Sequence, residues 1–153
     1  MHKVYLSLGA NLGDRRKTIN QAIKQIEELI GTVERQSALY ETAPWGFSSD
    51  HLFMNAAVCS LTQLTPRQVL EATQCIEKNL GRTHKSVDNE YHDRMIDIDI
   101  LLYDDLTVNE PDLKIPHPLM YQREFVMLPL REIKEMPDRT VRTEQTEKHL
   151  SSV

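Results

Sequence analysis

Two aspartates, Asp97 and Asp99, stand in an otherwise apolar run from position 95 to 103, Met-Ile-Asp-Ile-Asp-Ile-Leu-Leu-Tyr. The alternation predicts a β-strand, in which successive side chains point to opposite faces of the sheet. The two carboxylates therefore share one face, with backbones roughly 6.6 Å apart, while the isoleucines between them take the other. Neighbouring carboxylates repel each other and lose hydration on burial, so they indicate either a bound cation or a solvated face.

Oxygen ligands of this kind select a hard divalent cation. Mg²⁺ in particular takes one or two protein carboxylates and completes its shell with water and substrate phosphates. The pair therefore predicts a magnesium site that meets a nucleotide. The alternative is an edge strand with one solvated face, because Asp-x-Asp is a short motif that arises often by chance.

Length and composition predict one globular domain over residues 1–153. The chain is 17.7 kDa, with 40% hydrophobic and 27% charged residues, 5 Gly and 7 Pro, which excludes a disordered or collagen-like chain. A formal charge of −5 argues against a nucleic-acid binder. Cys59 and Cys75 lack metal-ligand spacing, and we expect free thiols in the core. The first residues lead directly into a strand, so we expect neither a signal peptide nor a membrane span, and a cytoplasmic location.

The elements that position the two aspartates are expected in the order β-α-β-β-α-β. Asp14 is expected to cap the first helix, and Thr65 with Gln68 forms a capping box before the second. This order predicts a ferredoxin-like α+β sandwich with a short C-terminal extension. The extension holds a helical patch from Gln122 to Ile133, interrupted or restarted at Pro129, and a polar, frayed tail over about 137–153. The expected elements are strands over 4–8, 32–42, 53–62 and 95–103, and helices over 19–30 and 66–80.

Five motifs in order resemble one family, 6-hydroxymethyl-7,8-dihydropterin pyrophosphokinase, over nearly the whole chain. That family moves pyrophosphate from ATP to a pterin alcohol, with release of AMP, in folate biosynthesis, and its fold is the same ferredoxin-like sandwich. The motifs are Leu-Ser-Leu-Gly-Ala-Asn-Leu-Gly at 6–13, Tyr-Glu-Thr-Ala-Pro-Trp-Gly at 40–46, Phe-Met-Asn-Ala-Ala-Val at 53–58, Arg-Met-Ile-Asp-Ile-Asp-Ile-Leu at 94–101, and Ile-Pro-His-Pro at 115–118 followed by Arg123 and Phe125.

The resemblance implies that Asp97 and Asp99 hold two Mg²⁺ ions with ATP. Phosphoryl transfer asks the protein mainly for in-line positioning and charge neutralisation, which suits cationic side chains beside the metals. Arg82 and Arg94 are then catalytic. The implied ATP-binding residues are Gln74, Glu77, Lys85, Ile100, His117 and Arg123.

For the pterin, the resemblance implies a planar slot in which an amide reads the ring edge and two aromatic side chains stack on the ring. An amide offers both donors and acceptors, and offset stacking suits a flat heterocycle. Asn55 is the expected amide, because a polar side chain within an apolar strand calls for a partner. The implied pterin-binding residues are Thr42, Ala43, Pro44, Trp45, Phe53, Asn55, Tyr91 and Phe125.

Several positions depart from the family pattern, so no role is carried over to them: His84, Glu90, His92, Asp93, Asp112 and Pro118. The expected partners are ATP and 6-hydroxymethyl-7,8-dihydropterin, with no nucleic acid and no membrane, and we expect a monomer. Two alternatives remain. One is a ferredoxin-like metal- or ligand-binding regulatory module, because fold alone does not fix function. The other is a different metal-dependent nucleotide transferase.

Overall fold

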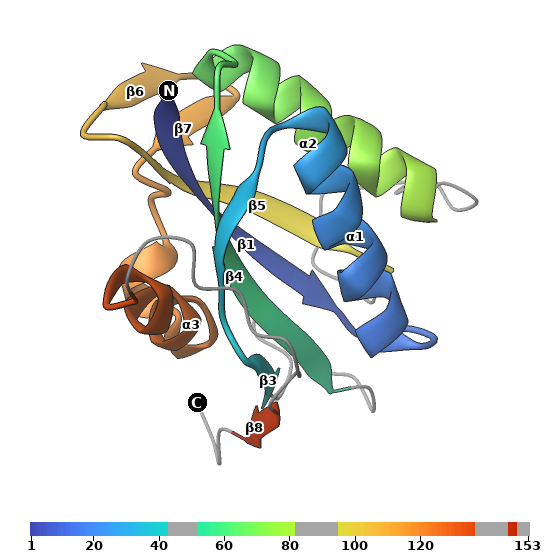
Figure 1. Ribbon diagram of the computed structural model, residues 1–153. Coiled ribbons are helices and arrows are strands. Elements are labelled where there is room, and N and C mark those ends of the chain that lie inside the picture. The colour runs from blue at the N-terminus through green and yellow to red at the C-terminus, as the bar shows by residue number, and fades with distance from the viewer. Residues whose placement is uncertain (43–51, 82–94, 137–146, 150–153) are drawn as a thin grey trace.

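The computed structural model describes residues 1–42, 52–81, 95–136 and 147–149. Two helices lie on one face of an antiparallel sheet and a third on the other (Figure 1). Together with the element order, this confirms the ferredoxin-like α+β sandwich. The elements are β1 (His2–Ala10), α1 (Arg15–Leu29), β2 (Val33–Gln36), β3 (Leu39–Thr42), β4 (Phe53–Thr62), α2 (Pro66–Gly81), β5 (Asp97–Tyr103), β6 (Val108–Glu110), β7 (Leu113–Ile115), the 3₁₀ turn η1 (Met120–Gln122), α3 (Glu124–Lys134) and β8 (Glu147–His149).

The central sheet has the strand order β5-β1-β4-β3-β8, with β2 also paired to β4. All of these pairs are antiparallel except β3 with β8. The strand that carries the two aspartates is therefore at the edge of the sheet that the described residues form. Of the tail expected to fray, the structure describes Glu147–His149, which pair with β3; the single domain over the whole chain stays a prediction.

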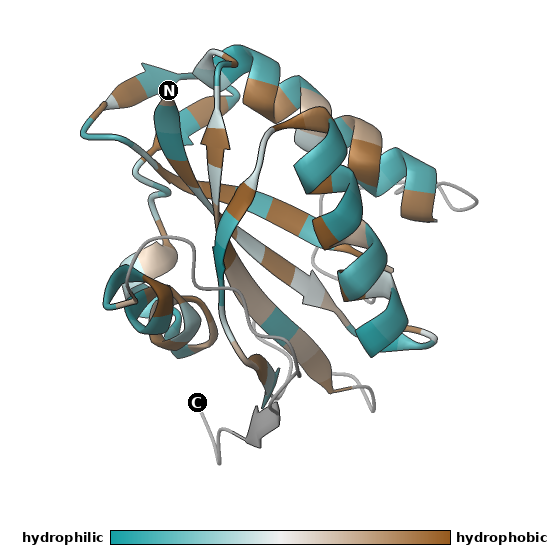
Figure 2. Ribbon diagram, in the orientation of Figure 1, coloured by the Kyte–Doolittle hydropathy of each residue, from teal (hydrophilic) through white to brown (hydrophobic). Residues whose placement is uncertain are grey.

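Two hydrophobic cores stabilise the sandwich, one on each face of the sheet. The larger lies under α1 and α2, whose apolar residues alternate with hydrophilic ones in Figure 2. The smaller lies under α3 and includes Cys59 and Leu101. Gly31, which follows α1, lies closely against the backbone of β4, since a Cβ there would lie 1.7 Å from the carbonyl oxygen of Leu61. Any larger residue at position 31 would force the chain apart.

Both predicted helix starts are confirmed. The Asp14 side chain accepts a hydrogen bond from the backbone N–H of Lys17 at 3.1 Å. In the capping box, the Thr65 hydroxyl accepts from the N–H of Gln68 at 3.2 Å, and the Gln68 side chain accepts from the N–H of Thr65 at 2.9 Å. These bonds satisfy N–H groups that lack partners within the helix.

Three expectations are corrected. Residues 32–42 do not form one strand, because Ser37 interrupts the ladder: its hydroxyl accepts from the N–H of Ala57 at 2.9 Å in place of a backbone carbonyl. Helix α3 continues through Pro129, since burial of Pro129, Leu130 and Ile133 offsets the hydrogen bond that proline cannot donate. Cys59 is buried as expected, but Cys75 is exposed, because it lies on the outward face of α2.

Among the described residues, no helix is both long enough and apolar enough to span a membrane.

Candidate functional site

Asp97 and Asp99 lie on the predicted shared face of β5. Both are partly exposed, whereas Ile96, Ile98 and Ile100 are buried in the core under α1 and α2. In the register with β1, Asp97 is opposite Gly9 and Asp99 is opposite Ser7. These partners are small, so no bulky side chain of β1 stands opposite either carboxylate.

A third carboxylate, that of Glu77 on α2, reaches the outer edge of β5. Its Oε2 accepts a hydrogen bond from the backbone N–H of Ile98 at 2.8 Å, a group that no neighbouring strand can pair because β5 is at the edge. Burial, and then the negative charge of Asp97, raise the pKa of Glu77 to about 8. The folded protein therefore keeps a proton on Glu77 at neutral pH, beside the carboxylate of Asp97.

The donor set fits a magnesium ion that is shared with a substrate. No group of three or more His, Cys, Asp or Glu side chains in the described part of the chain is arranged to hold a metal ion by itself. Glu77 bonds both to the backbone N–H of Ile98 and to the side chain of Asp97. The sequence pattern makes Asp97 and Asp99 the expected protein ligands. Two partly exposed carboxylates match the way Mg²⁺ is bound through phosphates and water.

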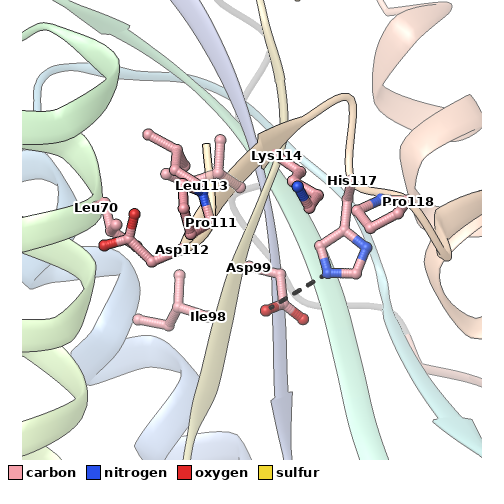
Figure 3. A pocket seen from close by; sticks show the side chains of 10 residues that line it. Leu70, Ile98, Asp99, Pro111, Asp112, Leu113, Lys114, His117 and Pro118 are labelled. Atoms are coloured by element: carbon pink, nitrogen blue, oxygen red, sulfur yellow. Dashed lines mark ion pairs between the residues drawn. The ribbon is translucent and has the colours of Figure 1, made fainter. Parts of the chain in front are cut away.

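His117 faces Asp99 from the segment after β7 (Figure 3). Its Nε2 lies 4.0 Å from Oδ1 of Asp99, which is too long for a hydrogen bond, and its Nδ1 accepts from the N–H of Leu119 at 3.3 Å. Burial, and then the charge of Arg123, lower the pKa of His117. The lowered pKa favours the neutral imidazole, in which Nδ1 accepts the bond from Leu119 and Nε2 carries a proton that can be donated to a ligand.

A pocket straddles the edge of β5, between α2 and the β6–β7 hairpin (Figure 3). Its wall is largely apolar, and Asp99 and His117 stand at one side. Ile100, which the family resemblance implies as an ATP-binding residue, is among the residues that line it. Most of the other lining residues were not predicted from the sequence. Asp112 and Pro118 had no role assigned to them. The full lining is Leu70, Ile98, Asp99, Ile100, Pro111, Asp112, Leu113, Lys114, His117 and Pro118.

Arg67, near the start of α2, holds the tip of the hairpin that forms one wall of this pocket. Its Nη1 donates to Oδ2 of Asp112 at 2.6 Å, and its Nη2 contacts the carboxylate of Glu110. This pairing holds the pKa of Asp112 below its usual range. All three side chains are well exposed.

A second group of predicted residues lies on the same sheet face, one strand beyond Gly9. Asn55 on β4 is opposite Gly9 and is 3% exposed. Its Nδ2 donates to the hydroxyl of Thr42 at 2.8 Å. A Cβ on Gly9 would lie 3.0 Å from Oδ1 of Asn55 and 3.6 Å from the Phe53 ring, so glycine keeps the space beside both side chains open.

Arg123 and Phe125 flank the start of α3. Arg123 is 5% exposed, and its guanidinium carbon lies 5.8 Å from the centre of the Phe125 ring. A buried guanidinium stacked on an aromatic ring is held in a fixed orientation, from which it can meet an anion.

The structure does not place the remaining predicted site residues beside those described above. Gln74 is exposed on α2, one turn before Glu77, and is not among the residues that line the pocket. Seven predicted residues lie outside the described part of the chain: Ala43, Pro44, Trp45, Arg82, Lys85, Tyr91 and Arg94.

Comparison with known proteins gives a family match over most of the chain. A model of the family described as 7,8-dihydro-6-hydroxymethylpterin-pyrophosphokinase (HPPK) matches residues 5–135. A 2-amino-4-hydroxy-6-hydroxymethyldihydropteridine pyrophosphokinase from Porphyromonas gingivalis is 49% identical over 131 residues, which are 85% of this chain and 89% of that relative. A protein of the same name from Bacillus subtilis is 38% identical over 144 residues, 94% of this chain and 84% of that relative.

Solved structures share the fold at lower identity. An HPPK-DHPS structure in complex with substrates matches with a TM-score of 0.67 and 18% identity, over 86% of this chain and 40% of that one. Wild-type HPPK-DHPS from Plasmodium falciparum matches with a TM-score of 0.67 and 16% identity, over 99% of this chain and 43% of that one. This chain therefore spans about two fifths of the solved chains that it resembles.

Proposed function

The chain belongs to the 7,8-dihydro-6-hydroxymethylpterin-pyrophosphokinase family, and on that basis we propose that it transfers pyrophosphate from ATP to the hydroxymethyl group of 6-hydroxymethyl-7,8-dihydropterin, in folate synthesis. The hydroxymethyl oxygen forms a bond to the β-phosphorus, the bond from that phosphorus to the α–β bridging oxygen breaks, and AMP leaves while the hydroxyl proton is lost. One observation carries the proposal. Asp97 and Asp99 lie between the pocket at the edge of β5 and the Asn55 amide on the same sheet.

We assign Mg²⁺ to Asp97 and Asp99, with two ions expected when ATP is bound. The ions would neutralise charge on the phosphate oxygens and favour loss of the hydroxyl proton. The support from this chain is that both aspartates are partly exposed on one face of the sheet, opposite the small residues Ser7 and Gly9.

The pocket at the edge of β5 is the proposed site for the nucleotide. Its apolar wall of Leu70, Ile98 and Pro111 suits a flat base. The proton on Nε2 of His117 and the guanidinium of Arg123 suit phosphate oxygens, because donors that are held in place before charge develops stabilise that charge. The family pattern adds Gln74, Glu77, Ile100 and Lys85 as ATP-binding residues, and Arg82 and Arg94 as catalytic ones.

The space beside Gly9 is the proposed site for the pterin. Asn55 gives one N–H to Thr42, and its second N–H and its Oδ1 suit the donors and acceptors of a pterin edge. Phe53 and Phe125 are the proposed stacking rings. Asp97 and Asn55 lie on either side of Gly9, about 9.5 Å apart across two strand spacings, so a ligand held by Asn55 can extend toward the carboxylates. Ala43, Pro44, Trp45 and Tyr91 complete the proposed slot.

An assay of AMP release from ATP tests the proposal. AMP should form only when the protein, the reduced pterin alcohol and Mg²⁺ are all present, and EDTA should abolish it. Binding of ligands without turnover would instead favour a regulatory module, and AMP formation with an unrelated alcohol would favour another nucleotide transferase. The monomeric state and the cytoplasmic location expected from the sequence stay predictions.

A further inference from the structure

Arg15, the first residue of α1, contacts the ends of two neighbouring strands. Its Nη1 donates to the backbone carbonyl of Leu52 at 2.8 Å, and its Nη2 donates to Oε2 of Glu41 at 2.7 Å. Glu41 lies in β3, and Leu52 directly precedes β4. One guanidinium therefore holds both strands of the β3–β4 pair at the same end.

The two partners of Arg15 flank the proposed pterin residues. In the register of β3 with β4, the last pair is Thr42 with Phe53, and the next is Glu41 with Met54. Thr42 also accepts the hydrogen bond from Asn55, which fixes how the amide is turned. The position of the Asn55 amide thus depends on the last residue pair of a ladder, and the ends of ladders are where strands open most easily.

The contacts of Arg15 with Glu41 and Leu52 stabilise this end of the strand pair against opening. The side chain of Arg15 is 27% exposed and that of Glu41 is 17% exposed, so their ion pair is more shielded from water than the surface pairs whose worth is close to zero. Both bonds are charge-assisted, and the rigid planar fork of arginine engages two acceptors at once. Lysine, with a single charged nitrogen, could not hold both acceptors in the same geometry.

We propose that Arg15 is a positioning residue for the pterin substrate: by tying Glu41 to Leu52 it keeps the Thr42–Phe53 pair closed and the Asn55 amide oriented. This inference rests on the proposed function, since it assigns the pterin to Thr42, Phe53 and Asn55. Arg15 itself touches neither Thr42 nor Asn55 through any hydrogen bond that the structure shows.

The test compares steady-state kinetics of Arg15→Ala with those of the full-length wild-type protein. The KM for the pterin should rise about tenfold, equivalent to about 1.4 kcal/mol, while kcat and the KM for ATP stay within about twofold. Arg15→Lys should recover part of this loss, and Glu41→Gln, which keeps the bond to Leu52, should lose less than Arg15→Ala. A general loss of folding would lower the active fraction and kcat without a selective rise in this KM.

Two further variants give a lower and an upper reference for the change in the pterin KM. Lys17→Ala removes the same charge from the exposed first turn of α1 and should change the pterin KM by no more than about twofold. Asn55→Ala, which removes the amide itself, should raise it at least as much as Arg15→Ala. An unchanged pterin KM in Arg15→Ala, beside an active wild type, would overturn the inference.

Amide exchange separates this inference from the proposed function. In Arg15→Ala, the backbone amides of Thr42 and Phe53, the last pair of the β3–β4 ladder, should exchange faster than in the wild type, with no substrate present. Unchanged exchange overturns the tie between the strands, whatever the activity. Absence of pterin-dependent AMP release from the wild type overturns the proposed function and the pterin role of Arg15, while exchange still decides whether Arg15 holds the strand ends.

Discussion

Asp97 and Asp99 show how far residue types and spacing can go without a structure. Period-two alternation placed both side chains on one face, and the structure confirms it. The alternation could not show that β5 is an edge strand, because edge position depends on which strands pair. It also could not show that Glu77 would contact the free N–H of Ile98 and gain a raised pKa, since that contact joins positions 21 residues apart in the chain.

Replacing either aspartate should remove activity and leave the fold intact. Asp97→Ala and Asp99→Ala each delete a proposed metal ligand, so turnover should fall at least about a hundredfold. Both side chains are partly exposed and contribute little to the core, so circular dichroism spectra should match the wild type. Asp105→Ala, an exposed carboxylate just beyond β5, serves as the control. A folded variant with wild-type turnover would contradict the metal assignment.

Glu77 should make the metal-free protein less stable as the pH rises. Its folded pKa of about 8 lies above the ordinary value of 4.5. Between these pH values the unfolded chain ionises while the folded protein keeps its proton, so the free energy of unfolding falls from about pH 4.5 and levels off above about pH 8. Glu77→Gln has no proton to lose and can still accept from Ile98, so this loss should disappear.

Urea unfolding in EDTA measures that difference. At pH 8 the Gln variant should be more stable than the wild type by at least about 1.4 kcal/mol, the equivalent of one pKa unit, and at pH 5 the two should nearly agree. Added Mg²⁺ should narrow the gap at pH 8. Parallel stability curves for the two proteins across this range would show that the Glu77 carboxyl is not perturbed.

Among the secondary-structure elements, the strongly periodic ones were predicted best. The strand of 53–62 and the capped helix after Thr65 are as expected, because each carries its own local signal. The break at Ser37 was missed, since a serine hydroxyl that replaces a backbone acceptor leaves no mark in hydrophobic periodicity. The β6–β7 hairpin and its place beside α2 were missed too, because polar pairs such as those of Arg67 are set by tertiary contact.

The hairpin should depend on Arg67 for its position beside the nucleotide pocket. Arg67→Ala removes both contacts with Glu110 and Asp112, and the affinity for a non-hydrolysable ATP analogue should fall about two- to threefold, a small effect because all three side chains are exposed. Calorimetric titration should show a smaller difference at 0.5 M salt, where such pairs are screened. Arg131→Ala, which removes an exposed arginine on α3, is the matched control. If the Arg67 variant binds the analogue as tightly as the wild type, the position of the hairpin does not depend on Arg67.

At the scale of the whole molecule, one face of the sheet packs the larger core and the other carries the proposed site. Helices α1 and α2 cover one face with the larger core, while α3 lies on the other face (Figure 1). Asp97, Gly9 and Asn55 are in register with one another on the face away from α1 and α2. The net charge of −5 gives no general attraction for a nucleotide, so anion binding must come from individual donors such as His117 and Arg123. The sequence alone could name these donors but not their arrangement.

The most direct test of the proposed reaction is to identify the group that is transferred. Phosphorus NMR of a reaction containing ATP, Mg²⁺ and 6-hydroxymethyl-7,8-dihydropterin should show one AMP formed for each pterin consumed, with both the β- and γ-phosphorus appearing as a diphosphate ester of the pterin. ADP together with a pterin monophosphate, or AMP with free pyrophosphate whether or not the pterin is present, would contradict the account.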